Sequence, residues 1–173
     1  MKTDNKKIFD FGDAASRESL KTYLSELKKA GTKIVFTNGC FDILHVGHLR
    51  YLKGSRAAGD FLIIGLNTDE SVRKNKGHGR PIVPQRERAE MLLGLECVDS
   101  IVFFGEVTPK EIIEFIRPDA LVKGAQYAEH EIVGASFVQS YGGRLIRAEM
   151  TGGASSTNLI EKIIDTYGGV KEK

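Results

Sequence analysis

Two histidines three positions apart, His45 and His48, are the residues whose types and spacing best suit chemistry. They follow an apolar run typical of a strand, 34–36, and they open a stretch typical of a helix, 46–58. The first turn of a helix carries unpaired N–H groups and the positive end of the helix dipole, so it favours an anion. Imidazoles there can donate hydrogen bonds to phosphate oxygens, and Gly47 leaves room for a phosphate. The segment predicts phosphate chemistry.

The histidine pair allows two other interpretations. A pair three residues apart could supply half of a zinc site, but Cys40 and Cys97 lie far apart in the sequence and no second His/Cys cluster is present. The pair could also be a structural helix cap with two incidental histidines, and the tetrapeptide alone leaves that open. The strand, loop and helix around it favour the phosphate interpretation. No metal-binding residue is predicted.

Composition limits the classes of protein that fit. The chain has 173 residues, of which 41% are hydrophobic, which is enough for one well-cored α/β domain. The net charge of +2 gives no strong field for nucleic acid or a membrane surface, and neither is predicted as a partner. No apolar run is long enough to span a membrane, and the polar start is unlike a signal peptide. Two cysteines fit a reducing compartment, so a cytoplasmic protein is expected.

Strand and helix signals alternate along the chain. An amphipathic helix comes first, with apolar residues at Leu20, Leu24 and Leu27, and Gly31 ends it. Short apolar strands are predicted at 34–37, 61–66, 100–104, 120–122 and 144–148. Helices are predicted at about 46–58, 85–95, 109–116, 131–141 and 156–166. The alternation predicts a single α/β domain: a Rossmann-like, doubly wound, parallel five-stranded sheet with helices on both faces.

Three further segments could face the same crevice, because ligands in such sheets bind beyond the carboxyl ends of the strands. Segment 73–80 holds four cations and two glycines, and it could equally be a solvated, mobile loop. Segment 122–127 ends a strand with a glycine that lets backbone approach a base, or it is an ordinary turn. Segment 152–157 offers hydroxyls and free N–H groups to phosphate, and it can cap a helix at the same time.

Sequence stretches along most of the chain match one family in order and spacing. They include FTNGCFDILHVGHLRYL, GLNTDESVR, KGHGRPI, RERAEML, CVDSIVFF, PDALVKG and SSTNLIEKI. The chain resembles the cytidylyltransferase-like nucleotidyltransferases, and within them the D-glycero-β-D-manno-heptose 1-phosphate adenylyltransferases. Some of these are halves of a bifunctional kinase/adenylyltransferase. The 32 residues ahead of the match are too few for a kinase, so the stand-alone form is expected.

The resemblance implies a reaction and a division of the chain. A phosphate oxygen of the sugar attacks the α-phosphorus of ATP, and ADP-heptose and pyrophosphate form without a covalent enzyme intermediate. Residues 1–32 would be an N-terminal extension with one amphipathic helix, 33–166 the nucleotidyltransferase domain, and 167–173 a C-terminal tail. Mg²⁺ is expected with the triphosphate and held mainly by its oxygens. A homodimer is implied by the family alone.

The resemblance also implies roles for individual residues. Those that act on the α-phosphoryl group are His45, His48 and Lys76. Those that bind the nucleotide in the loop are Asn38, Gly39, Cys40, Phe41 and Asp42. Phosphates would be neutralised by Arg88 together with Lys74 or Lys76, while backbone at Lys123 and Gly124 would read the base. The residues expected to bind the β- and γ-phosphates of the triphosphate are Ser155, Ser156 and Thr157. Asp42 is either the nearest carboxylate for a metal or its water, or an Asx cap of the loop.

One departure from the subfamily pattern concerns the nucleotide base. Gln126 stands where the subfamily usually has aspartate, close to the expected base or ribose pocket. The nearest alternative is therefore a cytidylyltransferase that acts on glycerol 3-phosphate or another small phosphate. A nucleotide-binding module without turnover is a second alternative from a different class. Cys40 is expected not to be a nucleophile, because its backbone is what the site would use.

Overall fold

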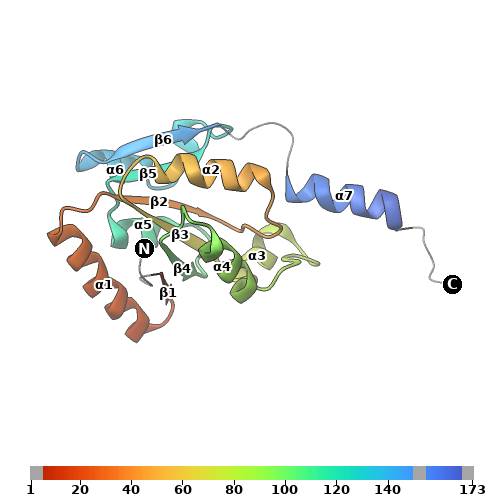
Figure 1. The fold of residues 1–173 in the computed structure, drawn as a ribbon, viewed down its shortest axis with the longest axis horizontal. Coiled ribbons are helices and arrows are strands. Elements are labelled where there is room, and N and C mark those ends of the chain that lie inside the picture. Colours follow the sequence, from red (N-terminus) through yellow and green to blue (C-terminus); the bar gives the residue numbers. More distant parts are fainter. Residues whose placement is uncertain (1–5, 150–154, 169–173) are drawn as a thin grey trace.

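The computed structural model describes residues 6–149 and 155–168. Its centre is a parallel sheet of six strands in the order β1-β4-β3-β2-β5-β6 (Figure 1). The strands are β1 (Lys7–Asp10), β2 (Ile34–Gly39), β3 (Phe61–Asn67), β4 (Ser100–Phe104), β5 (Ala120–Gly124) and β6 (Arg144–Ala148). The expected parallel, doubly wound α/β architecture is confirmed.

Helices cover both faces of the sheet. They are α1 (Ala14–Lys29), α2 (Val46–Arg56), α3 (Asp69–Lys76), α4 (Gln85–Gly94), α5 (Lys110–Ile116), α6 (Ala135–Ser140) and α7 (Ser156–Tyr167), with a 3-10 turn η1 (Glu129–Glu131). Helices α1, α5 and α6 contribute side chains to one buried cluster, and α2 and α4 contribute to another. The two clusters are the two halves of the core.

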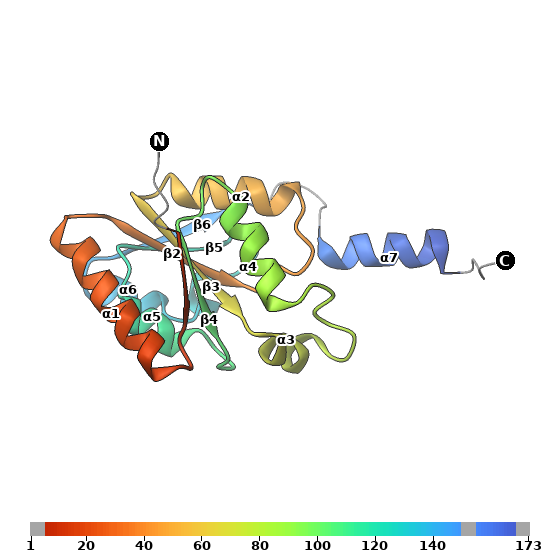
Figure 2. The ribbon, with the colours of Figure 1, turned by 60° about the horizontal axis from the view of Figure 1, so that its bottom comes forward.

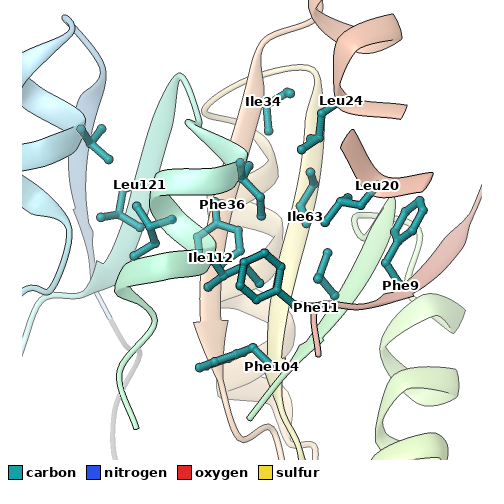
Figure 3. Close-up of a cluster of buried hydrophobic side chains, with 14 of the residues drawn as sticks. Phe9, Phe11, Leu20, Leu24, Ile34, Phe36, Ile63, Phe104, Ile112 and Leu121 are labelled. Carbon is teal, nitrogen blue, oxygen red and sulfur yellow. The ribbon is translucent and has the colours of Figure 1, made fainter. Parts of the chain in front are cut away.

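The central strands are apolar on both faces because both faces are covered. Along β2, Ile34 and Phe36 join the first cluster, shown in Figure 3, whereas Val35 joins the second. Along β3, Ile63 faces the first cluster and Leu62 the second. All five side chains are fully buried. This two-sided burial explains the continuous apolar runs in the sequence, which are typical of parallel sheets.

The site is placed by the point where the strand order reverses. From β2 the chain proceeds to β3 and β4 on one side of the sheet, and β5 and β6 lie on the other side. The connection after β2 runs towards one edge of the sheet and the connection after β5 runs towards the other. Where two neighbouring connections diverge in this way, a crevice opens beyond the carboxyl ends of the two strands. Figure 1 shows the loop that leaves the end of β2 and leads into α2, and residues of this loop and of α2 line a cavity there.

The sequence predicts five strands, whereas the sheet of the described residues has six. The missed strand, β1, is a four-residue edge strand that pairs with β4, and only one of its residues is buried. Lysines at its start and an aspartate at its end interrupt the apolar pattern by which a strand is recognised in a sequence. An edge strand needs no continuous apolar run, so this pattern is weak here. Next to it, α1 buries Leu20, Tyr23 and Leu24 in the first cluster. Residues 7–29 thus add a strand and a helix to the same layers.

The last helix stands apart from these layers. Figures 1 and 2 both show α7 projecting from the body of the molecule, and none of its residues is buried. Large apolar side chains, Ile163, Ile164 and Tyr167, are exposed along it. Among the residues that the structure describes, no helix is both long and apolar enough to cross a membrane.

Candidate functional site

A cavity of ≈ 390 Å³ lies beyond the carboxyl ends of β2 and β5. Its walls come from the loop after β2, the first turns of α2, the segment that follows α3, the end of β5 and the start of α7. The predicted site residues that line it are Asn38, Gly39, Cys40, Phe41, Asp42, His48, Lys76, Lys123, Gly124, Ser155, Ser156 and Thr157. The structure therefore brings together four stretches that are distant in sequence: 38–51, 76–80, 123–127 and 155–157.

The histidine pair forms a stack at the start of α2. His45 is the cap residue of the helix, and its Nδ1 accepts a hydrogen bond from the N–H of Gly47 at 3.1 Å. A neutral His45 therefore carries its proton on Nε2, where it can be donated to a ligand. The rings of His45 and His48 are stacked with centroids 3.9 Å apart. The Phe41 ring lies 5.3 Å from His48 on another side.

Burial keeps both imidazoles neutral in the free protein. It lowers the pKa of His48 to about 4, with a further lowering by the neighbouring His45, and it also lowers the pKa of His45. Within residues 6–149 and 155–168, the buried Nδ1 of His48 has no hydrogen-bond partner. A polyanion in the cavity would favour protonation of both rings. The pair is thus suited to answer negative charge that builds on a ligand.

A tight turn shapes the loop after β2. Phe41 adopts a left-handed backbone conformation, with φ of 46°, and its ring packs into the second core cluster. A Cβ atom on Gly39 would lie 3.1 Å from that ring, which is tighter than most side chains tolerate. Burial raises the pKa of the Cys40 thiol. This is opposite to the lowered pKa that a reactive cysteine needs, so the shift gives no support to a nucleophilic Cys40.

Asp42 fastens this loop to the basic segment after α3. Its carboxylate accepts hydrogen bonds from the N–H groups of Ile82 at 2.8 Å and Val83 at 2.9 Å, and from Nε of Arg80 at 2.5 Å. Burial alone would raise the pKa of Asp42, but these donors outweigh it and lower the pKa. The sequence left Asp42 as a metal ligand or an Asx cap. The structure shows a third arrangement, in which its oxygens are already used.

The end of β5 is tied to α2 beneath the cavity. The Tyr51 hydroxyl donates to the carbonyl of Val122 at 3.1 Å and lies 2.7 Å from Oγ1 of Thr37. Burial raises the pKa of Tyr51 to about 12, so the hydroxyl stays protonated. Above the strand end, a Cβ atom on Gly124 would lie only 2.1 Å from Oε1 of Gln126, so the Gln126 amide already fills that space. The amide therefore covers the backbone that was expected to read the base.

A second helix start faces the cavity from the opposite side. Ser155 caps α7 by accepting a hydrogen bond from the N–H of Asn158 at 3.0 Å. The Ser156 hydroxyl donates to the carbonyl of Ile43 at 3.0 Å, which joins α7 to the loop ahead of the histidines. Residues 152–154 of the predicted hydroxyl segment lie outside the described residues.

Comparison with known proteins decides the family. The cytidylyltransferase-like family profile matches residues 36–162, which include every segment that lines the cavity. The chain belongs to the cytidylyltransferase-like family. It is 49% identical over 151 residues to the bifunctional protein HldE of Syntrophotalea carbinolica, covering 87% of this chain and 31% of that protein. It is 50% identical over 141 residues to HldE of Geobacter metallireducens, covering 82% of this chain and 29% of that protein. The chain spans about 30% of the length of these relatives.

Solved structures agree with this family assignment. A lipopolysaccharide core biosynthesis protein from Thermoplasma volcanium superposes with a TM-score of 0.58 and 27% identity, over 69% of this chain and 98% of that one. Pantoate-beta-alanine ligase from Francisella tularensis superposes with a TM-score of 0.63 and 15% identity, over 97% of this chain and 80% of that one. The second likeness shows the fold alone. The family resemblance expected from the sequence is confirmed.

Three predicted site residues, His45, Lys74 and Arg88, are not among the residues that line the cavity, although the His45 ring stacks on that of His48, which does line it. Arg88 is 1% exposed, and its guanidinium donates to the carbonyls of Val83, Cys40 and Asn67 and to the Asp69 carboxylate. Lys74 pairs with Glu70 at 2.7 Å on the exposed side of α3. Arg88 is therefore placed to hold the loop carbonyl at Cys40 from below rather than to meet a phosphate directly.

Four residues that line the cavity were not among the predicted site residues. They are Tyr51, Arg80, Gln126 and Tyr127. Arg80 belongs to a basic segment that the sequence had singled out, and Gln126 had been noted as a departure from the subfamily, so signals existed for both. Tyr51 reads as an ordinary core position of an amphipathic helix, and no sequence signal separates it from its apolar neighbours.

The protein side of the cavity offers little to a metal ion. Among the residues described, no three His, Cys, Asp or Glu side chains are grouped closely enough to hold one. The carboxylate of Asp42, the one that lines the cavity in this part of the chain, is occupied by Arg80 and two backbone N–H groups. The residues present therefore do not fit a protein-held metal site.

Proposed function

We propose that the protein transfers the adenylyl group of ATP to a heptose 1-phosphate and releases pyrophosphate. The observation that carries the proposal is the stacked pair of imidazoles at the start of α2: His48 lines the cavity with His45 stacked on it, and the hydroxyl-bearing start of α7 lines the same cavity. Near 50% identity to HldE proteins over most of the chain supports the choice of acceptor and base. The product would be an ADP-heptose.

The proposed chemistry is a direct displacement at phosphorus. A phosphate oxygen of the sugar forms a bond to the α-phosphorus, the bond from that phosphorus to the bridging oxygen breaks, and the electron pair leaves with pyrophosphate. His45 and His48 donate hydrogen bonds to the phosphoryl oxygens as charge develops on them. Lys76 reaches the leaving phosphates from the cavity rim. Mg²⁺ would arrive with the triphosphate, bound to its oxygens and water, and no step here depends on a protein ligand to it.

Rigid positioning is the second part of the mechanism. Arg88 and Asp42 hold the loop after β2 from two sides, one through the carbonyl of Cys40 and one through Arg80. The loop can then bind a phosphate with its backbone N–H groups in a fixed geometry. Because no covalent intermediate is needed, catalysis rests on this positioning and on charge stabilisation.

Three wider expectations belong to the same proposal. The enzyme is expected to be cytoplasmic, with Cys40 and Cys97 as free thiols. It is expected to form a homodimer, which light scattering on the purified protein would test. ATP is expected to be preferred to CTP, although the Gln126 amide both donates and accepts and so narrows the margin relative to a carboxylate.

A pyrophosphate-release assay tests the function. ATP and CTP are each combined with heptose 1-phosphate, other sugar 1-phosphates and glycerol 3-phosphate, and the product is identified by mass spectrometry. ADP-heptose as the dominant product supports the proposal. Turnover mainly with CTP and glycerol 3-phosphate would instead establish the alternative cytidylyltransferase. Nucleotide binding without release of pyrophosphate under any combination would indicate a binding module.

A further inference from the structure

Besides His48, three cationic side chains line the cavity, and they differ in the groups that balance their charge. Arg80 is paired with the buried carboxylate of Asp42 at 2.5 Å. Lys76 is exposed at the rim, where water solvates its ammonium group. Lys123, at the end of β5, has no ion-pair partner within the described ranges, and its Nζ lies 3.4 Å from the carbonyl of Asn38. Lys123 is thus the inner cation of the cavity without an anion.

Among the described residues, Lys123 is a cation held away from water without a neighbouring anion to balance its charge. Burial lowers the pKa of Lys123 to about 8, and the neighbouring Cys40 thiol acts in the opposite direction only when it is ionised. Removing an ammonium group from water without a counter-charge is unfavourable, so such a residue destabilises the empty protein.

We propose that the Lys123 ammonium group binds a phosphoryl group of the substrates, between the loop after β2 and the end of β5. This differs from the backbone role in base reading that the family resemblance implies for the same residue. The proposal rests on the proposed function for the identity of the substrates. Either the α-phosphate of the nucleotide or the phosphate of the acceptor has the required charge, and the experiment separates these two sources.

The geometry favours a ligand role over a structural one. A structural lysine in a protein interior gains stability from a carboxylate or several carbonyls, whereas Lys123 has one long contact to a carbonyl. Gly39 and Gly124 line the cavity together with Lys123, and the side chains that border these two glycines are the uncharged Phe41 ring and Gln126 amide. A phosphate oxygen in the cavity would convert the unfavourable burial of a cation into a charge-assisted hydrogen bond.

The test compares Lys123→Met with the wild type. Methionine keeps a similar stem but removes the charge, so the empty variant should melt at a temperature about 2–4 °C higher. Its affinity for the phosphate ligand that Lys123 contacts should fall about tenfold or more. Melting curves are recorded alone and with pyrophosphate, with ATP and with heptose 1-phosphate, and KM is measured for each substrate. Lys110→Met, at an exposed lysine on α5, is the matched control and should change neither quantity.

The outcomes distinguish all the alternatives. A loss confined to ATP and pyrophosphate assigns Lys123 to the nucleotide, and a loss confined to heptose 1-phosphate assigns it to the acceptor. A lower melting temperature with unchanged binding of both substrates would overturn the proposal and show a structural lysine. Lys123→Arg, which keeps the charge, should retain more binding than Lys123→Met. If the wild type bound neither ATP nor pyrophosphate, the proposed function itself would fail, which is a different result from unchanged binding in the variant.

Discussion

Two helix starts face the same cavity, and they are held in very different ways. Helix α2 contacts β2, β3 and β6 and buries Tyr51, Leu52 and Ser55. Helix α7 buries none of its residues, and the Ser156 hydroxyl at its start donates a hydrogen bond to the carbonyl of Ile43 in the body of the molecule. Figure 2 shows the contrast, with α2 lying along the sheet and α7 extending away from it.

The difference separates transition-state chemistry from substrate binding. Donors that stabilise a developing charge must already be in place, because reorganisation during the reaction would cost part of the gain. Helix α2, anchored through Tyr51 to both β2 and β5, meets that need for His45 and His48. A helix with few packing contacts can adjust its hydroxyls to a triphosphate as it binds. Variants at α2 should therefore change kcat, and variants at α7 should change KM.

The largest effect is expected at the anchored start. His48→Ala removes a donor that acts mainly as charge develops, so kcat should fall about 10²-fold or more while nucleotide affinity changes little. The variant protein should stay folded, because His48 has no hydrogen-bond partner at Nδ1 among the described residues. Steady-state kinetics with isothermal titration of ATP measures both quantities. A kcat within about threefold of wild type would end the catalytic assignment of this residue.

The second largest effect is expected at Asp42, which fastens the loop after β2. Asp42→Asn breaks a buried ion pair with Arg80 and leaves that guanidinium with an uncharged acceptor, which should lower the free energy of unfolding by about 3 kcal/mol. Because the same loop carries the phosphate-binding backbone, kcat should fall as well. Urea unfolding and kinetics give the two values. The exposed pair of Glu70 with Lys74 is the control, and Glu70→Gln should cost less than about 1 kcal/mol.

Local pattern predicted the features that depend on neighbours in sequence, and it missed those that depend on distant partners. His45 and His48 were found because a strand, a loop and a helix start surround them. The role of Asp42 was missed because its partner Arg80 lies 38 positions later. Arg88 was expected at the phosphates from the family resemblance, whereas in the structure its guanidinium is buried and donates to protein acceptors. No property of the local sequence distinguishes those two outcomes.

A smaller effect concerns pH, and it follows from the same burial. An unfolded chain takes up a proton on His48 near pH 6.5, whereas the folded protein takes it up near pH 4. The unfolded state therefore binds more protons in between, and stability should fall as the pH drops through this window. His48→Gln should reduce that loss. Melting temperatures at about pH 7.5 and about pH 5 test this, and a slope equal to that of the wild type would contradict the buried, neutral imidazole.

The smallest effect is expected at the loosely held start, where Ser156→Ala removes the hydrogen bond to the carbonyl of Ile43. A single hydrogen bond of this kind contributes about 0.5–1.5 kcal/mol, so KM for ATP should rise roughly two- to tenfold. The melting temperature and kcat should hardly change, because α7 buries nothing and the histidines stay anchored. Ser140→Ala, whose hydroxyl donates to the carbonyl of Phe137 in α6 away from the cavity, is the matched control and should leave KM unchanged. If Ser156→Ala instead lowered kcat as strongly as His48→Ala does, the two helix starts would act as one unit, and the division between chemistry on α2 and binding on α7 would be wrong.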